Sequence, residues 1–315
     1  MTQMTNSAAR VIDPILSEVA RGYQQANLVG MALFPRVPVR ARGGKIITFG
    51  KEDFMLYNNI QRAPGQNTKR VQFGYSGASY ALLDYSLEGQ VPIETEQEAM
   101  AVPGIDLSSR TVIGVQNIIY NRLEIAQAGL ATTAGTYASA NKTTLSGTAQ
   151  WSDQTSGVSD PMGDVETGKD AIRAKTGKRP NTVVMGAAVY SKVRTHPKVV
   201  DRIKYTGRDI ATPELLASLF GVQQVLIGDS IQAADDGTFS DTWGKFVVLA
   251  YTPIASLASQ GLPSYGYTYQ LEGAPTAEEP YYDRNTKSWI YPVTDTCAPV
   301  IAGAESGYLI SAAVA

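Results

Sequence analysis

The stretch 43–92 constrains the fold of this chain more than any other segment. Residues 45–49 form a strand-like run, and alternating runs at 71–75 and 80–87 close the stretch, so the pattern predicts a long β-hairpin. Its predicted tip, 58–67, is polar and rich in turn-forming residues. Because a two-stranded hairpin buries too little apolar surface to offset its ordering entropy, it needs a packing partner. We therefore expect this hairpin to complete its fold on another subunit.

Composition indicates a globular chain with room for intersubunit contact. The 315 residues suffice for one large domain or two ordinary ones with a sizeable core. Hydrophobic residues make up 43% of the chain and charged residues only 18%, which leaves much of the surface available to other subunits. The formal net charge of -2 argues against a protein that coats nucleic acid along its whole surface, so any DNA contact would be local.

Cysteine and histidine usage narrows the possible chemistry. The single Cys297 excludes a disulfide framework and a multi-cysteine metal site, and the single His196 removes most metal and acid–base options. The first residues contain no apolar segment of signal-peptide length, and no run of about 18 apolar residues occurs anywhere. We expect a soluble protein made in the cytoplasm, with no cofactor, no metal and no membrane contact.

A long helix is predicted at 107–130, after Asp106 as its N-cap. An apolar stripe runs along one predicted face, and polar residues occupy the others. The stripe comprises Ile118, Ile119, Leu123, Ala126 and Leu130, and the polar positions comprise Gln116, Asn117, Asn121, Arg122 and Glu124. A helix of this length would span a domain, and the polar, small-residue stretch 129–160 after it is predicted to be a hairpin or loop.

Helical and strand patterns alternate from 161 to 250, which indicates a compact α/β unit. Within it, Pro161 and Gly177 bound one predicted helix, and Thr212 and Gly221 bound another. Further strands are predicted at 265–271, 288–295 and 308–314. With the separate long helix and hairpin, we expect the chain as a whole to be of the α+β class.

Charge is distributed in blocks along the second half. Residues 167–208 contain eleven Lys or Arg against Asp170 and Asp201, whereas 210–283 contain nine acids against Lys245 alone. Such blocks would form a basic and an acidic surface, which identical subunits around an axis could bring together. The alternative is a pair of solvated helix faces, because exposed ion pairs are individually worth only about 0–1 kcal/mol.

Two motifs raise catalytic or nucleotide-binding alternatives. The segment from Gly163 to Asp170 has the glycine and lysine spacing of a phosphate-binding loop, but it lacks the hydroxyl residue after Lys169 and a preceding buried strand. A solvated helix start is the competing interpretation. Ser76, in a Gly-x-Ser-x-Gly-like context, could pair with His196 in a hydrolase, although no helix pattern follows the serine. His196 lies in a helix-ending sequence, where a surface or capping role is the alternative.

The acidic residues Asp235, Asp236 and Asp241 have oxygen ligands that suit calcium, but their spacing does not match the twelve-residue calcium loop. A β-turn explains the Asp-Asp-Gly-Thr sequence better. We expect no catalytic centre.

The order of these parts resembles the major capsid protein family of tailed bacteriophages, whose fold also occurs in encapsulin shells. The resemblance covers nearly the whole chain. Its most specific pieces are the arm ending at 33–39, Arg62-Ala63-Pro64-Gly65 at the hairpin tip, the segment 181–207, the run 212–228, and Trp243-Gly244-Lys245.

The resemblance implies a phage major capsid fold with five parts. These are an N-terminal arm at 1–42, an extended loop at 43–92, a peripheral domain at 93–180 with its spine helix at 107–130, an axial domain at 181–290, and a C-terminal return at 291–315. The loop would lie over the adjacent subunit, and the axial domains would gather at the centres of hexamers and pentamers. The expected contact residues are Asn58, Asn59, Arg62, Pro64, Gly65, Lys69 and Arg70.

The implied function is that of a structural protein rather than an enzyme. Copies would tile an icosahedral head around double-stranded DNA in a virion assembled in the host cytoplasm, with scaffolding, portal and decoration proteins as further partners. Lys45, Lys51 and Lys69 are available in the loop for the crosslink that some family members form, but no partner residue matches, so no crosslink is predicted. An encapsulin-like compartment shell and a soluble α/β hydrolase remain the alternatives.

Overall fold

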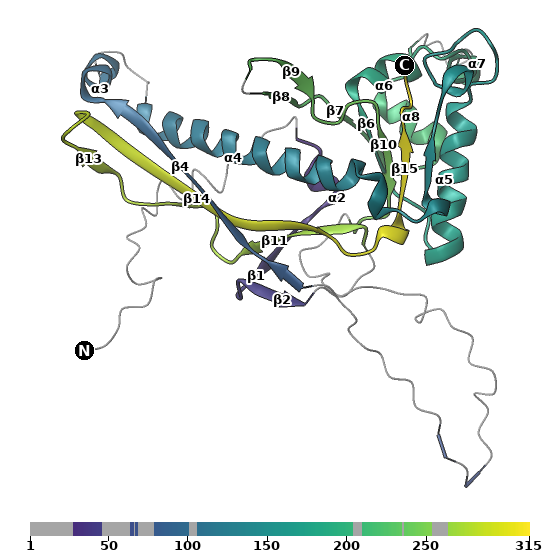
Figure 1. Ribbon diagram of the computed structural model, residues 1–315, viewed down its shortest axis with the longest axis horizontal. Helices are drawn as coiled ribbons and strands as arrows, with labels where there is room; N and C mark the ends of the chain where they lie inside the picture. Colours follow the sequence, from purple (N-terminus) through teal and green to yellow (C-terminus); the bar gives the residue numbers. More distant parts are fainter. Residues whose placement is uncertain are drawn as a thin grey trace.

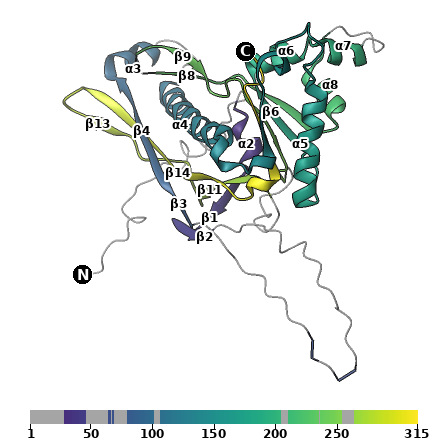
Figure 2. The same cartoon turned by 45° about the vertical axis from the view of Figure 1, so that its right-hand side comes forward.

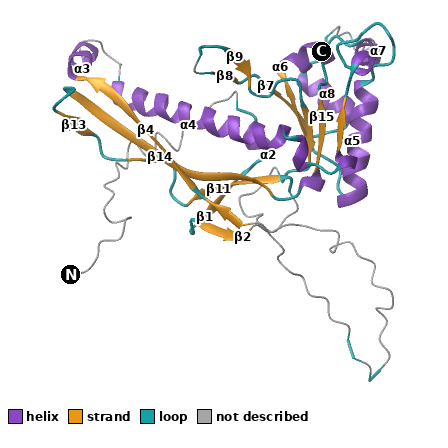
Figure 3. Ribbon diagram, viewed as in Figure 1, coloured by secondary structure: helices purple, strands orange, loops and turns teal. Residues whose placement is uncertain are grey.

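The computed structural model describes residues 28–45, 64–65, 67–68, 79–100, 106–203, 210–234, 236–253 and 264–315. Two layered parts meet side by side in the described chain (Figure 1). One is a platform, in which a long helix lies along a six-stranded sheet. The other is an axial unit, in which helices cover a five-stranded sheet. The described chain thus contains both helices and sheets, in agreement with the predicted α+β class (Figure 3).

The platform sheet is built around one long strand, β14 (Ser288–Ile301). β4 (Leu83–Pro92) pairs with it antiparallel over ten residues, from Cys297↔Leu83 to Ser288↔Pro92. β11 (Gly266–Leu271), β12 (Thr276–Ala277) and β13 (Tyr281–Asp283) also pair with β14. β1 (Arg36–Val39) joins β11 in parallel and completes the sheet.

The spine helix α4 (Leu107–Thr132) lies along this sheet, and Asp106 caps it as predicted, accepting from the backbone N–H groups of Ser108 and Ser109. The predicted faces of this helix are correct for Ile119 and Leu123, which are buried, and wrong for three other positions. Ile118 is 58% exposed, whereas the predicted polar positions Gln116 and Glu124 are fully buried. The buried residues repeat three and four positions apart from Val112 to Ala131, so tertiary contacts select a stripe that includes polar side chains.

The axial sheet has the strand order β5-β15-β10-β6-β7. Its strands are β5 (Lys142–Thr144), β15 (Gly307–Ser311), β10 (Val247–Ala250), β6 (Thr182–Gly186) and β7 (Gln224–Gly228). One face packs in a common core with α5 (Pro161–Thr176), α6 (Ala187–Val193), α7 (Pro197–Ile203) and α8 (Pro213–Phe220). The other face packs against α2 (Gly30–Leu33) and the end of α4.

The predicted helix limits in the axial unit are confirmed. Asp160 caps α5, which has Pro161 in its first turn, and Thr212 caps α8 by accepting from Leu215 N–H. Gly177 and Gly221 end these helices in the left-handed conformation, which L side chains rarely adopt. Local sequence signals therefore determine where both helices begin and end.

The remaining elements are short. Two hairpins, β2 (Gly43–Lys45) with β3 (Ser79–Ala81) and β8 (Ile231–Ala233) with β9 (Phe239–Asp241), form separate two-stranded ribbons. α3 (Ile93–Met100) follows β4 at the outer end of the platform. The predicted loop at 129–160 contains the end of α4, the short parallel strand β5, and three 3-10 turns: η2 (Ala134–Thr136), η3 (Ser139–Asn141) and η4 (Gly147–Ala149). A further turn, η6 (Ala304–Ser306), links β14 to β15.

The sheets divide the chain differently from the expected domain limits. Residues 83–92, expected in the extended loop, are β4 of the platform, and 266–283, expected in the axial domain, form β11 to β13 of the same sheet. The reason is long-range pairing with β14, which supplies backbone partners for β4, β11, β12 and β13. The last strand, β15, returns to the centre of the axial sheet.

Candidate assembly site

The β2–β3 ribbon, here called the loop root, pairs the residues on either side of 46–78. At this root the Tyr80 ring stacks on Tyr269 of β11, with 4.2 Å between ring centroids, and Tyr80 is nearly buried. Beside it, Arg42 Nη1 donates to Asp84 Oδ2 at 2.6 Å, and Asp84 Oδ1 accepts from Thr296 Oγ1 at 2.6 Å. Aromatic packing and these polar contacts thus fix the root on the platform.

Two of the predicted contact residues lie in the described part of the tip. Pro64 and Gly65 form an exposed turn, and Gly65 has a positive φ of 86°. Asn67 and Thr68 are exposed as well. The other predicted contact residues, Asn58, Asn59, Arg62, Lys69 and Arg70, lie outside the described residues, as do Lys51 and Ser76. The described tip residues therefore offer surface to a neighbour, and the contact itself stays a prediction.

A buried carboxylate holds the N-terminal arm on the body. Glu124 of α4 accepts from Val29 N at 3.1 Å, from Gly30 N at 2.8 Å and from Trp243 Nε1 at 2.7 Å. The arm, the spine helix and the loop before β10 thus meet at one side chain. Burial raises the pKa of Glu124, and the Trp243 hydrogen bond opposes that shift more than those from Gly30 and Val29.

Further contacts extend this attachment along the arm. Gln127 Nε2 donates to Thr268 Oγ1 at 2.9 Å, and Thr268 Oγ1 donates to the carbonyl of Phe34 at 3.0 Å. The guanidinium of Arg36 lies 4.7 Å from the centre of the Tyr120 ring. Glu124 is one of the predicted polar positions, and Gln127 is in neither predicted set. Their spacing from Val112, in steps of three and four, is the signal that places them on the buried stripe.

The segment resembling a phosphate-binding loop has a packing role instead. Lys169 is 6% exposed, and its Nζ donates to the carbonyl of Phe220 and to Glu166 Oε2, both at 2.7 Å. A Cβ on Gly168 would lie 2.9 Å from the Tyr308 ring, so the glycine allows α5 to approach β15. No strand immediately precedes α5, and Lys169 ties it to the end of α8. The helical part of the alternative interpretation is confirmed, because 163–170 lie in α5, but its solvated part is wrong for the buried Lys169.

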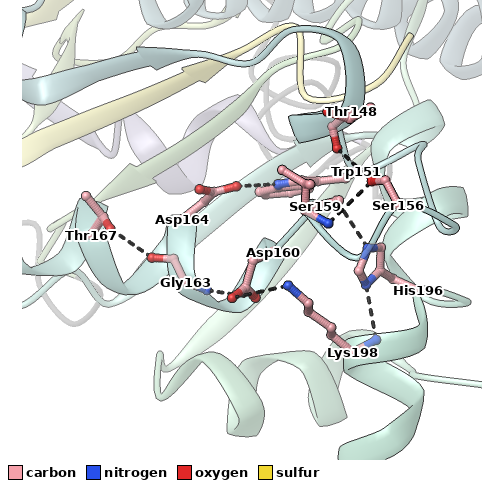
Figure 4. Close-up of polar contacts among 11 residues, drawn as sticks. Thr148, Trp151, Ser156, Ser159, Asp160, Gly163, Asp164, Thr167, His196 and Lys198 are labelled. Carbon is pink, nitrogen blue, oxygen red and sulfur yellow. Dashed lines mark hydrogen bonds and ion pairs between the residues drawn. The ribbon is translucent and has the colours of Figure 1, made fainter.

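The hydrolase alternative pairs His196 with Ser76, which lies outside the described residues. Figure 4 shows His196 beside a different serine, Ser159. His196 Nε2 lies 3.2 Å from Ser159 Oγ, while its Nδ1 accepts from Lys198 N–H at 3.3 Å. Nδ1 must therefore be unprotonated, which places the proton on Nε2 in the neutral ring and makes that nitrogen the donor to Ser159. This tautomer cannot take a proton from the serine, so the arrangement caps α7 rather than activating a nucleophile.

The polar contacts around this pair also belong to a helix start, in this case that of α5. Asp160 accepts from Gly163 N–H and lies 3.7 Å from Lys198 Nζ, and Trp151 Nε1 donates to Asp164 at 2.7 Å (Figure 4). Burial lowers the pKa of His196, and the positive charge of Lys198 lowers it further. His196 is buried and caps a helix, so of the two alternative roles in the sequence analysis only the capping role is confirmed.

Asp236 lies in a turn before β9, and Asp235 lies outside the described residues. Asp236 Oδ1 accepts from the backbone N–H and the hydroxyl of Thr238, and both hydrogen bonds lower its pKa. Among the described residues, no group of three or more His, Cys, Asp or Glu side chains could hold a metal ion. Within that same part of the chain, no helix combines the length and hydropathy needed to cross a membrane.

Comparisons with known proteins identify the family. Residues 131–248 match the family model described as phage major capsid protein E. The major capsid protein of Burkholderia phage BcepMu is 38% identical over 309 residues, which cover 97% of each chain. The chain belongs to the phage major capsid protein family. A phage major capsid protein associates with copies of itself and is part of the virion.

Solved structures agree with this family. A phage-related protein from Bordetella bronchiseptica RB50 is 44% identical and superposes with a TM-score of 0.83, covering 96% of this chain and 98% of that one. The capsid structure of cyanophage P-SCSP1u, 10% identical, gives 0.58 over 99% and 92% and shows the fold alone. The architecture is the one shared by phage capsids and encapsulins, as the sequence analysis expects.

Proposed function

We propose that this capsid protein forms the icosahedral head that encloses the double-stranded DNA of a phage, built from hexamers and pentamers. The observation that carries the proposal is the extended loop, whose root is fixed on the platform while its described tip residues are exposed. A hairpin of the predicted kind buries too little apolar surface by itself and would gain packing partners from another molecule. Membership of the phage major capsid protein family supports a second copy of the chain as that molecule.

In the proposed contact, the loop of one subunit lies over its neighbour through Asn58, Asn59, Arg62, Pro64, Gly65, Lys69 and Arg70. Five of these seven residues can supply side-chain amide or positively charged donors to backbone carbonyls and carboxylates. Pro64 and Gly65 form an exposed turn within the described part of the tip.

The phage head is favoured over a cargo compartment because the two curated relatives are both named major capsid proteins of phages. Encapsulins share the fold at low sequence identity, which carries no information about contents. The proposal extends to assembly in the host cytoplasm and to scaffolding, portal and decoration proteins as further partners. The function proposed is structural, and no enzymatic step is part of it.

Deleting residues 55–69 tests the role of the loop. We expect a soluble, folded subunit that no longer assembles, because the β2–β3 root and its packing on Tyr269 lie outside the deletion. Circular dichroism reports the fold, and electron microscopy with analytical ultracentrifugation reports the assembly. The control is Asn285→Ala in the exposed turn between β13 and β14, which keeps the backbone hydrogen bond to Asp283 and lies away from the loop root.

Normal shells formed by the 55–69 deletion would remove the loop from the assembly mechanism. To test DNA enclosure separately, particles purified from infected cells are treated with nuclease and their contents are extracted. Double-stranded DNA protected inside the shells supports a phage head, whereas a protected protein without DNA would support a cargo compartment.

A further inference from the structure

The β8–β9 ribbon has one apolar face that the described structure leaves uncovered. In its antiparallel register Ile231 lies opposite Asp241 and Ala233 lies opposite Phe239. Because directly opposed residues point to the same side of a ribbon, these four side chains share one face. Phe239 is 73% exposed and Ile231 is 58% exposed. Phe239 has the largest exposed fraction among the large hydrophobic residues that the structure describes.

Such a ribbon is marginal by itself, because two strands without a packed face bury little apolar area. It follows directly from β7, at the edge of the axial sheet, and extends to the side where α4 lies (Figures 1 and 2). The acidic residues Asp229, Asp236 and Asp241 are exposed along it. The ribbon therefore presents an apolar surface with a negative border.

The helix-covered side of the axial sheet has the complementary character. Lys192, Arg194 and Arg202 are exposed on and between α6 and α7. Ile210 is 51% exposed, and the next residue, Ala211, donates its N–H to the Arg194 carbonyl at 3.3 Å. The Arg194 guanidinium lies 5.9 Å from the Tyr190 ring centre. Arg194, Tyr190 and Ile210 thus form a basic and apolar surface, here called the α6–α7 patch.

We propose that the ribbon of one subunit docks on the α6–α7 patch of the next subunit around a capsomer. Phe239 and Ile231 pack on Ile210 and Tyr190, and Asp241 pairs with Arg194. The ribbon and the patch lie on opposite sides of the same axial sheet, and their charges are opposite. The contact is therefore between unlike surfaces, which closes identical subunits into a ring when the rotation permits.

This inference rests on the proposed function, because it assigns one contact within the proposed hexamers and pentamers. It also gives the two charge blocks of the sequence a shared role. Apolar burial supplies the attraction, and the charges select the orientation, since exposed ion pairs add little by themselves.

Site-directed crosslinking tests the contact. The double variant Asp241→Cys with Arg194→Cys is assembled, treated with a short bis-maleimide and run on a denaturing gel. We expect a ladder of covalent oligomers that ends at the capsomer size. The only native cysteine, Cys297, is 1% exposed, so the unmodified protein should give no ladder. Each single variant should also give none, because unlike surfaces do not bring two identical positions together.

The matched control pairs Ser240→Cys with Arg194→Cys, because Ser240 is the adjacent residue on the opposite face of the ribbon. A ladder no stronger than this control, from particles that assemble normally, overturns the ribbon contact and leaves the proposed function intact. Failure of the unmodified chain to form any multimer overturns both.

Charge reversal gives a second measurement that does not require assembled double-cysteine particles. Asp241→Arg and Arg194→Asp are each expected to lower particle yield several-fold, and the combination is expected to restore most of it. A double variant no better than the single variants overturns the proposed pairing.

Discussion

Glu124 shows how one side chain connects three segments that are far apart in sequence. Its carboxylate accepts from the arm at Val29 and Gly30 and from Trp243, and it lies on the spine helix at 1% exposure. A buried carboxylate is tolerated only when hydrogen bonds replace its hydration, and these donors supply them. These hydrogen bonds explain the buried position of Glu124 without any catalytic role.

Replacing Glu124 should destabilise the subunit. Glu124→Ala leaves three buried N–H donors without their acceptor, so we expect the free energy of unfolding to fall by about 3 kcal/mol. Glu124→Gln keeps one carbonyl oxygen for Trp243 and should cost less. Denaturant unfolding followed by tryptophan fluorescence measures both. The control is Glu98→Ala on the exposed side of α3, where we expect little change.

His196 gives the chain a defined pH response. Its folded pKa lies below the ordinary value of 6.5 because of burial, so the unfolded chain binds a proton more readily. The stability it contributes is therefore present above pH 6.5 and is lost as the pH falls through the folded pKa.

The measurement compares unfolding free energies between about pH 7.5 and about pH 5. His196→Asn keeps an N-cap acceptor for Lys198 N–H and should show a flatter profile than the native chain. Because the chain has one histidine, its imidazole NMR signal reports the folded pKa directly. A midpoint at or above 6.5 would contradict the assignment.

At the scale of elements, two helices respond oppositely to the same substitution. Gly168→Ala in α5 places a methyl group 2.9 Å from the Tyr308 ring, so we expect a net loss of about 1–3 kcal/mol despite better helix propensity. Gly114→Ala in α4 meets nothing within 4 Å and should stabilise by about 0.5–1 kcal/mol. Thermal unfolding of both variants measures these changes in stability. Equal changes in melting temperature for the two variants would show that the contact between α5 and β15 does not exclude a methyl group at position 168.

Helix limits were predictable because the signals are local. Asp106, Asp160 and Thr212 supply caps, and Gly177 and Gly221 supply ends, all within a few residues of the element they bound. The face of α4 was not predictable in the same way. Its buried stripe contains Gln116, Glu124 and Gln127, which look solvated until their tertiary partners are known.

At the scale of the whole molecule, the capsid fold could be recognised from the order of parts, but the sheet layout could not be derived from it. The assignment of 83–92 to the platform depends on pairing with 288–297, about two hundred residues later. Strand pairing over such a separation leaves no local signature. The contact residues of the loop depend on a neighbouring subunit, so the single chain cannot fix them.

The length of β14 has a mechanical consequence for the particle. Fourteen residues at about 3.3 Å each make a strut of about 46 Å, which runs through the platform and continues through η6 into β15. A load applied near α3 would therefore reach the centre of the axial sheet along covalent bonds. A pull along this direction would be resisted by the backbone as well as by side-chain contacts.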